Sequence, residues 1–312
     1  MSSIGELRTL ARSRRSGPGA RPEQKDNRVA YVFLIPWLLG VVLITIGPVL
    51  ASLYLSFTNY NLLQPPHFTG FANYVQMFGD SEFWTSLKVT LLYVVFSVPL
   101  QLILALGLAL LLDRGLRGLS FYRSVLYLPS LLGASVAVAI LWRQVFGSDG
   151  LVNRFLDLFG IHGPGWISNP STALSTIVLL HIWTFGSPMV IFLAGLRQIP
   201  RMYYEAAEVD GASTLRRFRS VTLPLLSPII FFNLVLQIIY AFQSFTQAFI
   251  VSGGTGGPSD STLFTTLYIY KQGFGRFHMG YASAMAWVLL VIVALFTAVN
   301  FWSSRFWVFY DD

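Results

Sequence analysis

The chain of 312 residues contains no cysteine, only four histidines and few charged side chains. The absence of cysteine excludes disulfide bonds and thiolate metal sites, and four scattered histidines offer no cluster of ligands, so we predict no metal site. Charged residues make up 11% of the chain, whereas soluble domains usually carry about 25%. There is also no GxxxxGK[ST] phosphate-binding loop, so the chain has no such ATP-binding motif of its own.

Apolar residues take the place of the missing charges. The chain is 54% hydrophobic and its mean hydropathy is +0.61. A soluble fold cannot hide this much apolar surface, so the expected solvent is a lipid bilayer. Runs of about 20 mostly apolar residues are long enough to cross a bilayer as helices. We predict an all-α membrane protein with six spans, near residues 29–58, 87–112, 121–146, 173–196, 222–251 and 281–304.

The distribution of basic residues predicts the orientation of these spans. If the N-terminus is cytoplasmic, 16 of the 21 lysine and arginine residues fall on the cytoplasmic side, in accordance with the positive-inside rule. Both termini then lie on the cytoplasmic side of the membrane, which the chain crosses several times. This topology accounts for the net charge of +7 without any binding to nucleic acid.

The predicted spans also define the domain organisation. Residues 1–28 are expected to form a disordered basic cytoplasmic tail, because so polar a segment cannot bury enough apolar area to fold. The apolar run that follows is too long for a signal peptide. Residues 29–305 form the membrane domain, with a cytoplasmic loop at 197–222, and residues 306–312 form a short cytoplasmic tail.

The predicted spans contain no charged residue well inside the membrane. Proton-coupled carriers use ionisable groups within the membrane as relays, and here Asp, Glu, Lys and Arg occur only near span ends. His181 is the one candidate relay, and we interpret it as a hydrogen-bonded packing residue. A secondary carrier could instead use sodium, bound through unwound backbone, and we keep this as a less favoured interpretation of the chain. An intramembrane enzyme is disfavoured, because the spans contain no carboxylate pair and no HExxH motif.

The cytoplasmic loop at 197–222 has the signals of two short helices. Pro200 suits the first turn of a helix, and Asp210-Gly211 can end that helix because glycine readily takes the left-handed conformation. Ser213 can then cap a second helix, before Leu223-Pro224 opens the fifth span.

The first of these helices presents a small and acidic surface. Ala206, Ala207 and Gly211 leave the backbone nearly bare, and Glu205 and Glu208 lie on one helical face, where they could meet basic groups of a partner. A helix lying on lipid headgroups would prefer basic and bulky apolar residues, so the composition favours a protein partner.

The run Tyr204-Glu-Ala-Ala-Glu-Val-Asp-Gly-Ala-Ser213, followed by Val221-Thr-Leu-Pro224, resembles the EAA loop of binding-protein-dependent ABC importer permeases of the type I, MetI-like fold. Other segments resemble the carbohydrate branch of that family, on the side of the maltose-type first permeases and the glycerol-phosphate permeases. They are Ala30–Pro36, Ser56–Tyr60, Phe121–Pro129, Ser252–Pro258 and Met279–Ala284. The similarity covers about residues 29–305.

The resemblance implies a subunit without catalytic chemistry of its own. Coupling to the ATPase is implied for Glu205, Ala206, Ala207, Glu208, Asp210 and Gly211. The implied partners are a second homologous permease, two cytoplasmic ABC ATPase subunits, an extracytoplasmic solute-binding protein and membrane lipid. The ATPases would bind ATP and Mg, and this chain would hold no cofactor. Transport would proceed by alternating access.

Polar residues in the fifth predicted span mark a candidate solute pathway. Asn233, Gln237, Tyr240, Ser244 and Gln247 recur every three or four residues, which places them on one face of a helix. Trp183 and Thr184 lie in the middle of the fourth span. Amides and aromatic faces bind sugars well, and the resemblance to carbohydrate permeases implies that these regions hold the sugar. The alternative is that these residues only join helices to one another by hydrogen bonds.

The sequence says less about the identity of the solute than about its pathway. Because no basic group lies within the spans, a neutral mono-, di- or oligosaccharide is favoured. A glycerol-phosphate-type ester is the alternative, with the partner permease supplying the positive charge.

Overall fold

The computed structural model describes residues 26–115, 118–133 and 135–309. Within these ranges the regular structure is helical, apart from one isolated antiparallel bridge between Thr58 and Phe68. The chain forms two compact units, residues 1–51 and 52–312, which we describe separately. Most of the predicted N-terminal tail, 1–25, and the last three residues of the predicted C-terminal tail lie outside the described residues.

The first unit contains the start of a long apolar helix. α2 (Asp26–Gly40) continues through a wider π turn, η1 (Val41–Ile46), into α3 (Gly47–Ser56), which crosses into the second unit. Pro48 has no backbone N–H and its ring displaces the carbonyl four residues earlier, so a π turn next to it is physically reasonable. The run Tyr31–Ser56 is long and apolar enough to cross a membrane, as predicted for 29–58.

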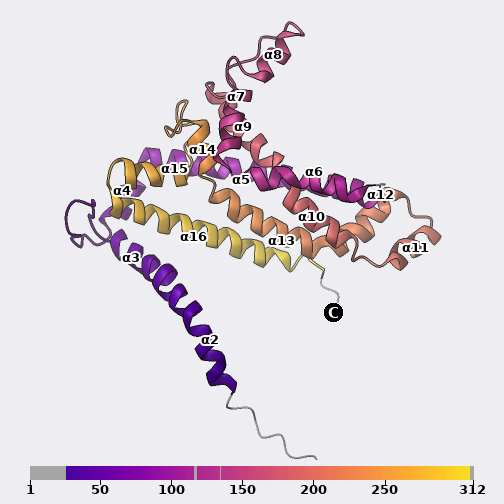
Figure 1. Cartoon of the computed structure of the whole chain (residues 1–312), viewed down its shortest axis with the longest axis horizontal. Helices are drawn as coiled ribbons and strands as arrows, with labels where there is room; N and C mark the ends of the chain where they lie inside the picture. Colours follow the sequence, from indigo (N-terminus) through magenta and orange to yellow (C-terminus); the bar gives the residue numbers. More distant parts are fainter. Residues whose placement is uncertain (1–25, 116–117, 134, 310–312) are drawn as a thin grey trace, which may run out of the picture. The chain divides into compact units, whose positions relative to one another are not determined.

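The second unit is a helical bundle in which α5 (Ser81–Asp113) is central (Figure 1). The remaining elements are α4 (Ala72–Phe78), α6 (Leu119–Leu132), α7 (Val136–Val145), α8 (Leu151–Asp157), α9 (Pro170–Trp183), α10 (Gly186–Leu196), α11 (Arg201–Val209), α12 (Thr214–Arg217), η2 (Phe218–Thr222), α13 (Leu223–Phe242), α14 (Thr246–Val251), α15 (Thr265–Tyr270), η3 (Lys271–Gly275) and α16 (Met279–Ser304).

The central helix packs against α9, α10, α13 and α15. Its N-terminus is capped by Asp80, whose carboxylate accepts hydrogen bonds from the backbone N–H groups of Glu82 and Phe83. Its buried residues include a series of small or polar ones: Ser86, Thr90, Ser97, Gln101, Ala105 and Ala109. Small residues allow helices in a membrane to approach closely, which explains how α5 can contact four neighbours.

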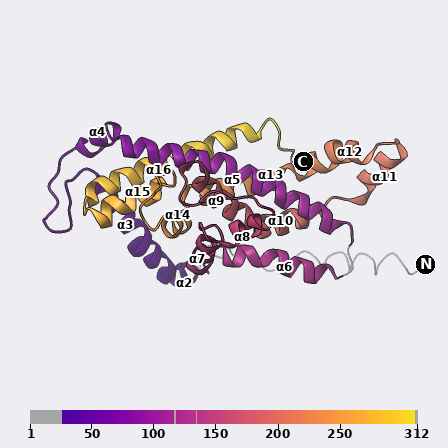
Figure 2. The same ribbon diagram turned by 90° about the horizontal axis from the view of Figure 1, so that it is seen from above.

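The bundle has two distinct ends. α11 and α12 lie at one end, and α4 and α15 lie at the opposite end, in both views (Figures 1 and 2). α11 and α12 contain the loop that the sequence places in the cytoplasm, so the α4–α15 end corresponds to the predicted outer face.

The spans are less regular than the sequence predicts. Four helical runs are long and apolar enough to cross a membrane, and the described residues contain up to six spans if each of two bent helix pairs counts as one. The third predicted span is divided into α6 and α7, with axes 95° apart, and the fourth into α9 and α10, with axes 42° apart. The sequence predicted one span in each of these two regions but did not show that either span is divided into two helices. In the fourth span Pro188 displaces the carbonyl of Thr184, where α9 ends.

The fifth span also differs at both ends. Leu223-Pro224 does not open it, because α12, η2 and α13 form one helical run, Thr214–Phe242, of 29 residues. The π turn η2 precedes Pro224, and the N–H of Leu223 bonds to the carbonyl of Phe218. At the other end α13 stops at Phe242 rather than near residue 251. There the hydroxyl of Thr266 donates to the carbonyl of Ser244 over 2.6 Å, which holds the chain out of the helix.

Candidate functional site

A cavity of about 480 Å³ lies where the second to fifth predicted spans meet. It is lined by amide, hydroxyl and aromatic side chains, and by the non-helical turns between α9 and α10 and between α13 and α14. The lining residues are Gln101, Ser130, Gly133, His181, Thr184, Ser187, Gln237, Tyr240, Gln243, Ser244, Phe245, Thr246 and Gln247. None of these residues is Asp, Glu, Lys or Arg, so the cavity can bind a solute through hydrogen bonds and ring faces but offers no counter-ion.

The break between α9 and α10 forms one wall of this cavity. Gln101 of α5 donates from Nε2 to the carbonyls of His181 and Thr184, both at 3.1 Å, and to Thr184 Oγ1 at 3.0 Å. Ser130 of α6 donates to the carbonyl of Thr184 at 3.0 Å and accepts from the N–H of Ser187 at 2.7 Å. Two neighbouring helices therefore satisfy backbone groups that the break releases.

His181 has a packing role, as the sequence indicated, and also lines the cavity. Its Nδ1 lies 3.1 Å from the hydroxyl of Tyr93, and the two rings pack edge to face at 5.5 Å between centroids. Its Nε2 is buried without a hydrogen-bond partner in the described part of the chain.

Five of the seven predicted pathway residues line the cavity: Thr184, Gln237, Tyr240, Ser244 and Gln247. The prediction that they share one helical face was wrong for Ser244 and Gln247, because α13 ends before them. These two instead interact directly, with Ser244 Oγ donating to Gln247 Oε1 at 3.2 Å.

The other two predicted pathway residues lie elsewhere. Asn233 is fully buried in the bundle, and both polar atoms of its side chain lack a partner among the described residues. Trp183 packs against Trp142, with ring centroids 6.1 Å apart. Neither is among the residues that line the cavity.

Sequence reasoning did not single out the contributions of the second and third spans, nor the break after α13. Gln101, Ser130, Gly133, Gln243, Phe245 and Thr246 were all missed as lining residues. One signal was available for Gln101, because an amide in the middle of an otherwise apolar span needs a polar partner or water.

The loop at 197–222 lies before α13, whereas the cavity lies at the end of α13. This loop has the two helices predicted from its sequence, α11 and α12. α11 ends in a Schellman motif: the N–H of Gly211 bonds to the carbonyl of Glu208 at 3.0 Å, and the N–H of Ala212 bonds to that of Ala207 at 2.9 Å. Gly211 has φ of +70°, the left-handed conformation that glycine takes without strain. Asp210 is the C-cap, and Ser213 caps α12 by accepting from the N–H of Arg216.

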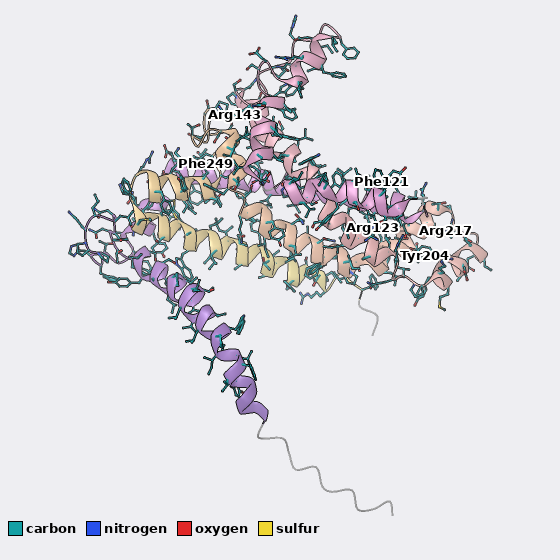
Figure 3. All side chains as sticks on the ribbon, in the orientation of Figure 1. Phe121, Arg123, Arg143, Tyr204, Arg217 and Phe249 are labelled. Carbon is teal, nitrogen blue, oxygen red and sulfur yellow. The ribbon has the colours of Figure 1, made fainter. Side chains whose placement is uncertain are left out.

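Two side-chain contacts hold α11 against the helical run that leads into the membrane. The hydroxyl of Tyr204 lies 3.0 Å from Thr222 Oγ1, and Glu208 pairs with Arg217. Figure 3 shows Tyr204 and Arg217 together at this end of the bundle. Glu208 therefore already has a basic partner within the chain, whereas Glu205 is exposed and makes no ion pair among the described residues.

The outward face of α11 is more apolar than the sequence reasoning recognised. Met202 and Val209 are 67% and 89% exposed, and together with Ala206 they recur at intervals of three or four on the same helical face as Glu205. An exposed face of this kind at the end of a bundle suits a protein partner rather than water.

Comparisons with known proteins agree on the family. Residues 90–307 match the family described as "Binding-protein-dependent transport system inner membrane component". The chain is 51% identical to the "Probable ABC transporter permease protein YesP" of Bacillus subtilis (strain 168), over 94% of this chain and 96% of that protein. It is 34% identical to the "Lactose transport system permease protein LacF" of Rhizobium radiobacter, over 88% of this chain and 93% of that protein.

A solved structure has the same fold. A chain of the bacterial alginate ABC transporter, crystallised in complex with alginate pentasaccharide-bound periplasmic protein, superposes with a TM-score of 0.76 at 21% identity, over 90% of this chain and 95% of that one. The helical bundle, the EAA-type loop and these matches lead to one conclusion: the chain belongs to the binding-protein-dependent family of transport system inner membrane components and is a multi-pass permease subunit of an ABC importer.

Proposed function

We propose that this permease forms one half of a translocation pathway for a carbohydrate, and that the solute binds in the cavity at the α9–α10 break. The observation that carries the proposal is the lining of that cavity, which combines amides, hydroxyls and the rings of Tyr240 and Phe245 with no charged side chain. Sugar hydroxyls both donate and accept hydrogen bonds, and amide and hydroxyl side chains complement them in both roles.

A neutral saccharide fits this lining better than an anion. A phosphate or carboxylate within a low-dielectric membrane site needs a positive partner, and the described lining residues provide none. The relative from Rhizobium radiobacter is named for lactose, which is neutral. The structural neighbour is named as an alginate transporter and was crystallised with an alginate pentasaccharide-bound periplasmic protein. The alternative of a glycerol-phosphate-type ester would require a cation from the partner permease.

The coupling surface is proposed to be α11 and the turn after it. Glu205, Ala206, Ala207, Glu208, Asp210 and Gly211 would dock in a groove of a cytoplasmic ATPase. The exposed side chains of Met202 and Val209 would supply apolar contact area, and Glu205 would supply an unpaired charge. Glu208 would act indirectly, since its pairing with Arg217 holds α11 against α12.

The complete transporter is proposed to contain a second homologous permease, two ATPase subunits that bind ATP and Mg, and an external solute-binding protein. ATP binding would close the ATPase pair and move α11, and the permease pair would reopen outward. Hydrolysis would return the pathway to the inward state, which is alternating access by rigid-body movement.

Reconstituted uptake tests the proposal directly. The assembled transporter in proteoliposomes, with its binding protein outside and ATP inside, is offered labelled lactose, maltose, trehalose, an alginate oligosaccharide and glycerol 3-phosphate in parallel. We expect ATP-dependent uptake of a neutral saccharide and none of glycerol 3-phosphate. Uptake of only the anionic probes would overturn the neutral assignment, and uptake of none of the saccharides would overturn the carbohydrate proposal.

A further inference from the structure

The bend between α9 and α10 leaves backbone groups without their usual helical partners in the middle of a span. Pro188 has no N–H to offer the carbonyl of Thr184, and its ring pushes that carbonyl aside. The N–H of Ser187 is among the first of α10 (Gly186–Leu196) and so has no partner within that helix. Non-helical backbone at membrane depth needs partners from neighbouring helices or from a polar cavity, and here neighbouring helices supply several of them.

Gln101 adds donors from α5 to those of Thr184, whose N–H and hydroxyl already donate to the carbonyl of His181 at 3.0 and 2.7 Å. The Nε2 of Gln101 carries two protons, which are directed to three oxygens of the break: the carbonyls of His181 and Thr184 and the hydroxyl of Thr184. This arrangement also determines the orientation of the amide, because exchanging the oxygen and nitrogen would place Oε1 against two carbonyls. Gln101 is almost fully buried, at 1% exposure.

Ser130 completes the set from a third helix. Its hydroxyl bridges the two sides of the break, since it donates to the carbonyl of Thr184 and accepts from the N–H of Ser187. It thus supplies a partner for one backbone group on each side of the break.

Two glycines let α6 approach closely enough for this bridge. A Cβ on Gly186 would lie 2.6 Å from the carbonyl oxygen of Leu126 and 2.7 Å from Ser130 Oγ. A Cβ on Gly133 would clash with Cγ2 of Thr184. The break and its two neighbours are therefore packed against one another without room for another methyl group.

The residues of this arrangement are also wall residues of the cavity. Gln101, Ser130, Gly133, His181, Thr184 and Ser187 all line it. We propose that Gln101, assisted by Ser130, is a positioning residue: its carboxamide holds the α9–α10 bend in one geometry and thereby sets the shape of the cavity. The effect on the solute depends on the proposed function, but the effect on the bend does not.

The bend can be measured without knowing the solute. The chain has no native cysteine, so spin labels can be placed uniquely at Ser175→Cys on α9 and Ala194→Cys on α10, both exposed positions. The assembled transporter, with any cysteines of the partner subunits replaced, is examined by double electron–electron resonance. Because the labels are 19 residues apart, a helical run would separate their backbones by about 28 Å at ~1.5 Å per residue, which suits the method.

We expect one narrow distance distribution in the otherwise unmodified protein and a clearly broader one in Gln101→Leu. The matched control is Gln144→Leu, the same change at an exposed position on α7, which should retain the narrow distribution. Ser130→Ala, a smaller change that is safer for folding, should give an intermediate width. Distributions as narrow in both cavity variants as in the control would overturn the proposal.

Transport kinetics provide the second readout, with lactose, maltose and trehalose as probes. For whichever of them is taken up, Gln101→Leu should raise the apparent KM by about tenfold or more, because the hydrogen-bonding groups of the wall are no longer aligned with the sugar hydroxyls. Thr184→Ser keeps the hydroxyl that accepts from Gln101 and should stay within about threefold of the parent.

The two proposals fail in different ways. If no saccharide is taken up by the parent transporter, the proposed function fails while the distance measurement still decides the role of Gln101. If saccharide is taken up and Gln101→Leu leaves both the distance distribution and the KM unchanged, the positioning role is wrong and the carbohydrate function stands.

Discussion

Tyr268 donates its phenolic proton to Asp80 Oδ2 over 2.6 Å, although the two residues are 188 positions apart in the chain. Tyr281 donates to the same oxygen at 2.6 Å, while Oδ1 caps α5. A single carboxylate thus joins the start of α5 to α15 and α16 at the predicted outer end of the bundle.

Replacing this carboxylate by an amide should destabilise the bundle without removing the helix cap. Asp80→Asn keeps an oxygen for the N–H groups of Glu82 and Phe83, because asparagine is as good an N-cap as aspartate, but it removes the charge that strengthens the tyrosine bonds. Hydrogen bonds to charged groups contribute about 1.5–3 kcal/mol each. We expect a lower midpoint of thermal unfolding for Asp80→Asn, with Tyr268→Phe causing a smaller decrease. An unchanged midpoint in both variants would show that the junction contributes nothing.

The same junction predicts a dependence of stability on pH. Burial acts to raise the pKa of Asp80, but the hydrogen bonds from Tyr268, Tyr281 and two backbone N–H groups outweigh it and hold the pKa below its usual value of 3.8. A carboxylate with a depressed folded pKa stabilises the fold above the unfolded pKa, and this stabilisation is lost as the pH falls through the lower folded value. The unfolding midpoint should fall more steeply below about pH 4 in the parent than in Asp80→Asn.

Gly211 should tolerate one substitution much better than others. Its φ of +70° costs a residue with a Cβ about 1–2 kcal/mol, but asparagine adopts this conformation comparatively readily. A Cβ at this position would meet no atom within 4 Å, so steric crowding does not confuse the comparison. We expect Gly211→Val to lower the solute transported per ATP hydrolysed and Gly211→Asn to preserve most of it. Equal coupling in both variants would contradict the proposed role of this turn.

Charge reversal at Glu205 should detach the ATPase. Its side chain is exposed and has no ion pair among the described residues, so Glu205→Lys leaves the fold of the loop unchanged and alters only what a partner encounters. We expect loss of co-purifying ATPase and of uptake. The control is Asp149→Lys, the same reversal at an exposed residue in a predicted outer loop, which should retain the ATPase. Full co-purification with Glu205→Lys would remove the docking assignment.

The α13 side of the cavity can be tested separately from the break. Gln237→Leu combined with Tyr240→Ala removes an amide and a ring from the lining, and no hydrogen bond from either side chain to the α9–α10 break is present. The apparent KM for the transported saccharide should rise by roughly 10-fold or more, since each lost hydrogen bond is worth about 0.5–1.5 kcal/mol. A rate and KM equal to those of the parent would refute this part of the site.

Local signals in the sequence were enough to predict the loop. The stop at Asp210-Gly211 and the cap at Ser213 depend on residues within a few positions of one another, and the structure has them as expected. The placement of apolar runs likewise predicted where most spans lie. These signals did not show that the fourth span is a pair of helices bent by 42°.

The rest depends on contacts between distant parts of the chain. The end of α13 at Phe242 has no proline or glycine to mark it, and it is held by Thr266, 22 residues away from Ser244. Gln101 reaches the carbonyl of Thr184 across 83 residues. Such partners are brought together only by the packed bundle, so the periodicity of one span could not reveal which of its polar residues would line the cavity.

The continuous run from Thr214 to Phe242 joins the two proposed sites mechanically. It begins beside the turn at Gly211 and carries Gln237 and Tyr240 near its far end, so about 26 residues and ~39 Å of helix separate them at ~1.5 Å per residue. A rod of that length acts as a lever arm. Tilting it by about 5° would shift one end by roughly 3 Å relative to the other, which is about the length of a hydrogen bond, so a modest push on the cytoplasmic side would be enough to change which cavity groups can reach a sugar.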